Sequence, residues 1–270
     1  MVGWFYLKRK GMKNVKPEAI CFFDMDGTLL TKAAEVSEKS LEALERLRAN
    51  HIVPIIATGR TTPEIAAKME LTGIDSAIIM NGQAVIYEGK KVYEDILEPE
   101  LMKRLTEEAK SQGVEACFYN DSKIRATSHN LLTKAHYDFL GEPMPVKDPT
   151  FFEKESINMA LLLLESGDDY FKGRFPELQF VRNTPFSNDV LRKDGSKAKG
   201  IKKFLNVCGY EDVPTYAFGD GNNDLEMFQA VHYGIAMENA VPALKEHAHF
   251  VTDSHNDEGI FKGLKHMGLI

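Results

Sequence analysis

The chain has 270 residues, of which 43% are hydrophobic and 27% charged, and this ordinary globular composition excludes a disordered or fibrous protein. Its 33 basic and 40 acidic side chains give a formal net charge of −7, so it lacks the broad positive field that nucleic-acid binding usually requires. The three cysteines, Cys21, Cys117 and Cys208, are far apart in the sequence, which is typical of reduced thiols and not of a disulfide framework or a zinc site.

Residues 1–16 are predicted to form an extension of the folded chain. The extension is apolar over Val2–Leu7 and then becomes basic, which is the reverse of the order in a signal peptide. No apolar run approaches the roughly 20 residues that a membrane span requires. Two interpretations of the extension stay open, a frayed segment with translation starting at Met12 or a short interaction arm. We expect a cytoplasmic protein with no membrane partner.

The next part of the chain, residues 17–83, alternates predicted strands and helices. Its first strand is continuously apolar, as expected of a strand that is buried on both faces. The first helix has Ser37 as a candidate N-cap, and the second opens with a proline at its first turn. The predicted strands lie at 19–23, 52–57 and 76–80, and the helices at 37–50 and from Thr62 onward. This alternation predicts right-handed crossovers and a parallel sheet.

From residue 84 to residue 190 the pattern changes to hairpins and two helical stretches. A hairpin is expected around Gly89-Lys90, because alternating strand-like residues flank it. A helix at 99–112 is followed by predicted strands at 114–119, 123–127, 158–165 and 178–182. These elements predict an α+β domain with an antiparallel sheet.

The alternating pattern returns over residues 191–270. Helices are predicted at 197–207 and 224–231, and strands at 215–218 and 234–237. The sequence therefore predicts an α/β core made of residues 17–83 and 191–270, with the α+β domain of residues 84–190 inserted between the two parts.

A motif with two carboxylates, Asp24-Met25-Asp26-Gly27-Thr28, directly follows the first predicted strand. Ligands bind at the carboxyl ends of parallel strands, so these side chains stand where a site is expected. Two carboxylates this close are tolerable only with a bound cation or a shared proton. One aspartate can then act as a nucleophile and metal ligand, and the other as a general acid/base. The alternative is a capped turn with two solvated aspartates.

Two further motifs suit phosphate binding. Thr58-Gly59-Arg60 stands at the end of the second strand, where a hydroxyl and backbone N–H groups can hold phosphate oxygens, although an ordinary strand-to-helix turn would give the same pattern. Lys197 stands at a predicted helix start, where a cation opposes the helix dipole. A neighbouring phosphate and carboxylates would explain that position.

The last motif again combines a strand, an acidic loop and a helix. Asp220 ends the strand and can complete an oxygen shell for Mg²⁺, while Asn223 and Asp224 begin the helix. Either of the latter two residues can also serve simply as the helix cap. The spacing of a calcium-binding EF-hand loop is absent from this segment.

These four motifs, in this order, resemble those of the haloacid dehalogenase (HAD) superfamily of phosphotransferases, from about Ile20 to Ile270. The insert after Asn81-Gly82 resembles the C2-type cap of the Cof-like phosphatases within that superfamily. The resemblance implies an α/β fold, with a Rossmann-like parallel-sheet core and an inserted α+β cap domain.

The resemblance also implies a role for each motif residue. Asp24 would be the nucleophile and a Mg²⁺ ligand, Asp26 the acid/base with a metal-binding backbone carbonyl, and Asp220 the third protein ligand. Thr58, with Gly59 beside it, and Lys197 would bind phosphate. Asn223 and Asp224 would support the phosphate and the waters of the metal.

We therefore expect a Mg²⁺-dependent phosphatase that passes through an aspartyl phosphate. A phosphomutase or phosphotransferase with the same nucleophile is the nearest alternative, distinguished by whether inorganic phosphate is released without a bisphosphate activator. A non-catalytic phosphometabolite-binding protein would need one of the motif positions to be degenerate.

The resemblance implies small phosphorylated metabolites, such as sugar phosphates, as substrates. The polar candidates for contacts with the leaving group in the insert are Lys123, Arg125, His129 and His136, although residues of these types are more often ordinary surface residues. Glu238 stands where the family pattern usually has glycine. Its carboxylate either lies near the mouth of the site and disfavours strongly anionic substrates, or points to water.

Overall fold

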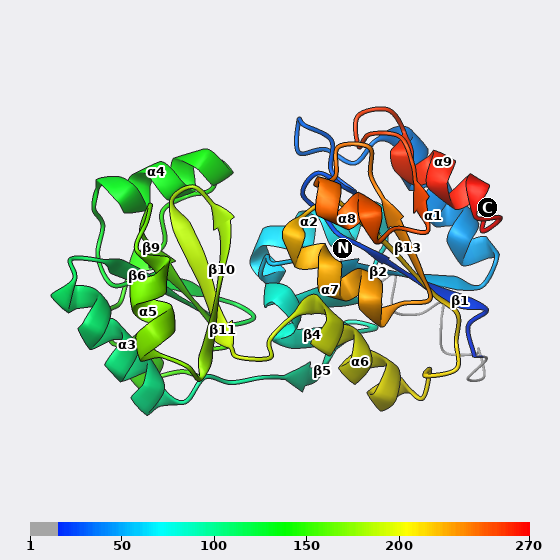
Figure 1. Cartoon of the computed structure of the whole chain (residues 1–270). Coiled ribbons are helices and arrows are strands. Elements are labelled where there is room, and N and C mark those ends of the chain that lie inside the picture. Colours follow the sequence, from blue (N-terminus) through cyan, green and yellow to red (C-terminus); the bar gives the residue numbers. More distant parts are fainter. Residues whose placement is uncertain (1–15) are drawn as a thin grey trace.

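The computed structural model describes residues 16–270 and consists of two parts, a core and a cap, each built around its own sheet (Figure 1). Apart from Lys16, the predicted extension at 1–16 lies outside the described residues. Within those residues, no helix is long and apolar enough to cross a membrane.

The core sheet has eight strands in the order β14-β13-β12-β1-β2-β3-β4-β5. The six strands from β14 to β3 are parallel, and β4 and β5 add an antiparallel hairpin at one edge. The central strand, β1, lies between β12 and β2, so the two strand ends that carry acidic motifs are neighbours. The strands are β1 (Ala19–Phe23), β2 (Ile52–Ala57), β3 (Ala77–Ile79), β4 (Ala84–Tyr87), β5 (Lys90–Glu94), β12 (Thr215–Gly219), β13 (Tyr233–Ala236) and β14 (Phe250–Val251).

Helices cover both faces of the core sheet, which explains why β1 is apolar at every position. Cys21 and Phe23 pack in one cluster with apolar residues of α1 (Glu38–Ala49) and α9 (Gly259–His266). Ile20 and Phe22 pack in another cluster with residues of α6 (Lys197–Cys208) and α7 (Leu225–Ala230). The remaining core elements are α2 (Thr62–Thr72), α8 (Pro242–Glu246) and two 3₁₀ turns, Met80–Gly82 and Asn222–Asp224.

The cap sheet has six strands in the order β10-β11-β9-β6-β7-β8 and is antiparallel except between β7 and β8. One face packs against α3 (Pro99–Ser111) and α5 (Asp168–Arg174), and the residues of β6 that point the other way pack with Tyr137 of α4 (Leu131–Leu140). The strands are β6 (Glu115–Tyr119), β7 (Ile124–Ala126), β8 (Val146–Lys147), β9 (Met159–Leu163), β10 (Leu178–Thr184) and β11 (Ser187–Arg192), with a 3₁₀ turn at Phe151–Glu153.

The boundaries of the insert differ from those expected. Residues 84–94, expected in the insert, form β4 and β5, and β4 pairs with β3 so that the hairpin extends the core sheet. At the other end, β11 runs to Arg192 and belongs to the cap sheet, beyond the expected end at residue 190. The cap therefore occupies about residues 95–192. The physical reason for the difference is that a hairpin has the same sequence pattern whichever sheet it joins.

Candidate active site

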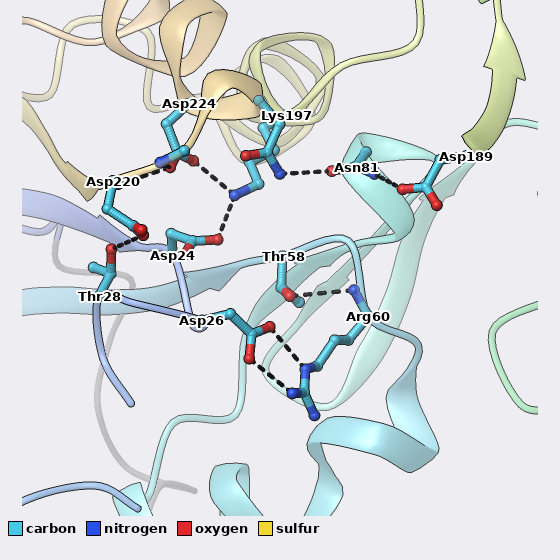
Figure 2. A network of polar contacts seen from close by, with 12 residues as sticks. Asp24, Asp26, Thr28, Thr58, Arg60, Asn81, Asp189, Lys197, Asp220 and Asp224 are labelled. Carbon is cyan, nitrogen blue, oxygen red and sulfur yellow. Dashed lines mark hydrogen bonds and ion pairs between the residues drawn. The ribbon is translucent and has the colours of Figure 1, made fainter. Parts of the chain in front are cut away.

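The predicted motifs meet where the ends of β1, β2 and β12 face the cap (Figure 2). A cavity of about 770 Å³ lies there, lined by residues of both the core and the cap. The predicted site residues in its lining are Asp24, Asp26, Thr58, Gly59, Asp220 and Asn223. The two others, Lys197 and Asp224, are buried and hydrogen-bonded to this group.

Asp24 occupies the first position after β1 and is only 6% exposed. Its backbone N–H donates to the carbonyl of Phe218 on β12, which extends the pairing of the two strands. Burial raises the pKa of Asp24 well above its usual range, Lys197 opposes the shift, and the carboxylates of Asp224 and Asp220 add to it. Asp24 is thus a carboxyl group with little access to water, and the neighbouring Lys197 is what favours its ionised form.

Lys197 is the first residue of α6 and is fully buried between two carboxylates. Its Nζ donates to Oδ1 of Asp24 at 2.5 Å and to Oδ1 of Asp224 at 2.7 Å. Burial alone would lower the pKa of Lys197, but the two carboxylates outweigh burial and raise it, so the side chain is an ammonium. These two ion pairs explain why a lysine is found at a helix start, where the helix dipole alone would disfavour a cation.

Asp224 fixes the loop that follows β12. Its Oδ2 accepts the backbone N–H groups of Asp220 at 3.0 Å and Gly221 at 2.9 Å. Asp220 in turn accepts the hydroxyl of Thr28 at 2.8 Å, and burial raises the pKa of Asp220 to about 6. Gly27 has φ +80° and lies so close that a Cβ there would be 2.3 Å from Oδ2 of Asp220.

The carboxylates form a group that fits a hard divalent cation. Asp24, Asp220 and Asp224 each offer an oxygen within 4.8 Å of the others, and oxygen is the ligand that Mg²⁺ prefers. Both oxygens of Asp224 already accept hydrogen bonds from Lys197 or from backbone N–H groups. Asp24 and Asp220 are therefore the better ligands, because burial and the neighbouring carboxylates raise the pKa of each and a cation beside them would favour the ionised forms.

The loops after β2 and β3 supply neutral polar groups. Thr58 is buried at the end of β2, and its Oγ1 accepts the backbone N–H of Arg60 at 3.2 Å. Asn223 donates to Oδ1 of Asn81 at 3.2 Å. Asn81 in turn donates to the carboxylate of Asp189 at 2.8 Å (Figure 2). Thr58 and Asn223 line the same cavity as Asp24 and Asp220, and their predicted contact with phosphate stays a prediction.

Asn81 and Asp189 are site residues that the sequence motifs do not include. Asn81 has φ +51° and precedes Gly82, at which a Cβ would lie 2.0 Å from the carbonyl oxygen of Ser196. This close approach places the Asn81 turn against the start of α6, beside Lys197. The Asn-Gly pair is the signal that could have found Asn81, because asparagine and glycine both tolerate positive φ.

Arg60, the third residue of the predicted Thr58-Gly59-Arg60 motif, is a further site residue for which no role was predicted. Its guanidinium donates to both carboxylate oxygens of Asp26, at 2.9 and 2.7 Å (Figure 2). Desolvation opposes its charge, but the carboxylate of Asp26 and those of Glu64 and Glu142 raise the pKa of Arg60. The Asp26 side chain is 58% exposed, far more than Asp24, so it can reach into the cavity. The position of Arg60 directly after Thr58-Gly59 is the signal that the sequence offers for it.

Of the polar candidates in the cap, His136 lines the cavity and is 2% exposed. The other three are engaged elsewhere among the described residues: Lys123 pairs with Glu155, Arg125 donates to the carbonyl of Ile124, and His129 contacts the carbonyl of Pro145. Glu238 is exposed and is not among the residues that line the cavity, which favours the interpretation that it points to water.

Known hydrolases and phosphatases are similar to this chain over most of its length. The protein-family model for haloacid dehalogenase-like hydrolases matches residues 21–264. "Putative phosphatase YkrA" of Bacillus subtilis is 34% identical over 253 residues, which cover 93% of this chain and 98% of that protein. The 5-amino-6-(5-phospho-D-ribitylamino)uracil phosphatase YwtE of Bacillus subtilis is 26% identical over 270 residues, with coverage of 88% and 93%.

Solved structures agree over the core and the cap together. A hypothetical protein of Geobacillus kaustophilus is 37% identical and superposes with a TM-score of 0.87, covering 94% of this chain and 100% of that one. The HAD subclass IIB sugar phosphatase BT4131 is 27% identical with a TM-score of 0.81, covering 93% of this chain and 100% of that one.

Proposed function

Because this chain belongs to the haloacid dehalogenase-like hydrolases and is a phosphomonoester hydrolase, we propose that it is Mg²⁺-dependent and transfers the phosphoryl group of small metabolites first to Asp24 and then to water. The observation that carries this proposal is the position of Asp24, a buried carboxylate at a strand end, held by Lys197 within reach of the oxygens of Asp220. The names of YwtE and BT4131 support sugar phosphates or related phosphomonoesters as substrates.

In the first half-reaction, a carboxylate oxygen of Asp24 attacks phosphorus while the bond from phosphorus to the ester oxygen breaks. Asp26 donates a proton to the departing alkoxide, so that an alcohol leaves. Lys197 orients Asp24 and offsets the charge of the phosphoryl oxygens, while Thr58 and Asn223, which line the cavity, would donate hydrogen bonds to those oxygens.

In the second half-reaction, water attacks the phosphorus of the aspartyl phosphate. Asp26, now ionised, takes a proton from that water, and the bond from phosphorus to Asp24 breaks to release inorganic phosphate. The two half-reactions therefore use Asp26 first as an acid and then as a base, from the same side of the phosphoryl group.

The acidic group would hold the metal through the carboxylates of Asp24 and Asp220 and the backbone carbonyl of Asp26. When bound, Mg²⁺ would supply charge neutralisation for the phosphoryl oxygens, which is a large part of catalysis in phosphoryl transfer. Asp224 would act behind it, because its hydrogen bonds to the backbone of Asp220 and Gly221 fix the position of the ligand loop.

A phosphate-release assay over a panel of phosphorylated metabolites, with p-nitrophenyl phosphate as a general substrate, tests this function. We expect turnover with Mg²⁺, loss of turnover in excess EDTA, and recovery when Mg²⁺ is added back. Full activity in EDTA would refute the metal dependence. Absence of phosphate release from every substrate, with the protein folded and Mg²⁺ present, would refute the proposed reaction.

A further inference from the structure

We propose that the cap selects phosphate monoesters whose leaving group carries no additional negative charge, and that Glu142 is the main residue responsible. This inference rests on the proposed phosphatase function and concerns the part of the cavity that would receive the leaving group. Three features of the cap support it: an arginine whose guanidinium is already bound by the cap itself, carboxylates that face the cavity, and neutral hydrogen-bonding groups between them.

Arg182, on β10, is the one lysine or arginine that the described part of the cap contributes to the lining of the cavity. Its Nε and Nη2 donate to the two oxygens of Asp168, and its Nη1 donates to the backbone carbonyls of Leu164 at 3.0 Å and Pro185 at 3.2 Å. Asp168 does not line the cavity, so the guanidinium is held by the cap itself. An anionic leaving group would have to compete with these bonds to use this charge.

Carboxylates from the end of α4 face the same space. Asp138 and Glu142 both line the cavity, and they flank the turn at Gly141 that ends the helix. Asp138 forms an ion pair with Lys134 on the same helix. The cation near Glu142 is Arg60 of the core, at 3.6 Å, and its Nε and Nη2 already donate to the carboxylate of Asp26. Glu142 thus adds negative charge beside the acid/base.

The groups between these charges are neutral hydrogen-bonding side chains. Burial lowers the pKa of His136 to about 4, so its imidazole is uncharged at neutral pH. Its Nδ1 lies 3.3 Å from the hydroxyl of Thr184, which lies 2.8 Å from the hydroxyl of Ser187. All three residues line the cavity. Such a wall suits hydroxyl groups of a leaving alcohol and offers no positive charge to a second phosphate or a carboxylate.

The groups on the cap side therefore suit a leaving alcohol that carries several hydroxyl groups and no charge, or a leaving alcohol that carries an amine. A second phosphate on the cap side of the cavity would face Glu142, whereas Lys32, the exposed lysine in the lining, belongs to the core. Bisphosphate activators are what a phosphomutase uses, so the charge of the cap favours hydrolysis over that alternative.

Competition against p-nitrophenyl phosphate hydrolysis, with Mg²⁺ present, tests the proposal on the intact enzyme. Three hexose derivatives share a primary phosphate and differ in charge: glucosamine 6-phosphate, glucose 6-phosphate and 6-phosphogluconate. We expect the inhibition constants to rise in that order, with about tenfold between the uncharged sugar and the carboxylate, since one unit charge at about 6 Å in a wet cleft has an effect of this size. Equal constants, or tightest binding of 6-phosphogluconate, would overturn the proposal. Loss of p-nitrophenyl phosphate turnover itself would instead refute the proposed function.

Two substitutions test whether Glu142 causes the preference against charged leaving groups. E142Q removes the charge at nearly constant shape and should tighten 6-phosphogluconate by about tenfold relative to glucose 6-phosphate, and E142K should reverse the order of the two. E155Q is the matched control, because Glu155 is a cap carboxylate that pairs with Lys123 and does not line the cavity. An equal change in E155Q and E142Q would overturn the assignment to Glu142. The wild-type series tests the selectivity even if a variant fails to fold.

Discussion

The two sides of the cavity are built in different ways. On the core side, Asp24, Lys197 and Asp224 are at most 6% exposed and are joined by short hydrogen bonds. On the cap side, the Glu142 and Asp138 side chains are 30% and 61% exposed, and they stand at the end of a helix. The buried side has little freedom to change, as expected for groups that must be aligned with a reacting phosphorus. Single residues on the exposed side can be substituted without disturbing buried contacts. Such substitutions would change which leaving groups bind while the reaction stays the same.

The largest loss of turnover should follow substitution of Asp24, a buried residue on the core side of the cavity. D24N removes the nucleophile and should lower turnover by about 10⁴-fold or more. The fold should survive, because burial and the neighbouring carboxylates already disfavour a charge at Asp24. Phosphate release and the thermal midpoint are the measurements, with D194N as control, since Asp194 is exposed and pairs with Lys199 outside the cavity. Turnover near that of the wild type in D24N would contradict the mechanism.

D26N should have the next largest effect, about 10²–10⁴-fold, because positioned acid–base catalysis contributes on that scale. The loss should be smaller with p-nitrophenyl phosphate than with an alkyl phosphate, since a good leaving group needs little protonation. With the activated substrate, the second half-reaction should become limiting and the aspartyl phosphate should accumulate.

Rapid-quench mass spectrometry of D26N would look for one added phosphoryl group on the peptide that contains Asp24. D194N again serves as the control. Equal losses for both substrates, without a trapped intermediate, would reduce Asp26 to a structural or metal-positioning residue.

The difference between the two sides also explains what the sequence could predict. The core site follows from largely buried strands that are followed by acidic or hydroxyl residues, so the sequence is enough to place Asp24, Thr58 and Asp220 together. Their hydrogen-bond partners could not be inferred in the same way. The ion pair of Arg60 with Asp26 depends on side-chain conformation across two loops, and a motif does not specify this.

The cap side was harder to predict for a physical reason. Strand β11 begins with Ser187, Asn188 and Asp189, whose side chains are polar yet buried, so the strand has no apolar pattern at the end that reaches the cavity. Glu142 lies in a turn after α4, where sequence alone gives no direction for a side chain. Four polar cap residues were equally plausible in the sequence, and burial singled out His136.

Removing the cap should show which properties belong to the core alone. A chain in which residues 95–192 are replaced by a short linker should keep the core fold, because helices cover both faces of the core sheet without the cap. It should lose the roughly tenfold charge preference, since Glu142 is gone. Circular dichroism and the same inhibition series are the measurements, with the full chain as the control. An unfolded product would show that the two parts depend on each other for stability.

Substitution of His136 should have the smallest effect on turnover. Its main effect should be on how the free energy of unfolding depends on pH. Burial lowers the pKa of His136 to about 4 in the folded protein, below the ordinary value of 6.5, so the unfolded chain binds more protons between these two pH values. The stabilisation from a neutral His136 is therefore complete above about pH 6.5 and is lost as the pH falls toward 4. Between pH 7.5 and pH 5 this group should cost the folded state about 2 kcal/mol.

Denaturant unfolding of the wild type and H136Q at both pH values measures this contribution. The variant cannot titrate at this position, so its free energy of unfolding should fall less on acidification, by about the same 2 kcal/mol. H247Q is the matched control, because it makes the same substitution at an exposed position of the core that does not line the cavity. Equal pH dependence in H136Q and the wild type would mean that His136 is not held neutral. The wall that faces the leaving group would then carry a positive charge in mildly acidic solution, and the preference against anionic leaving groups should weaken there.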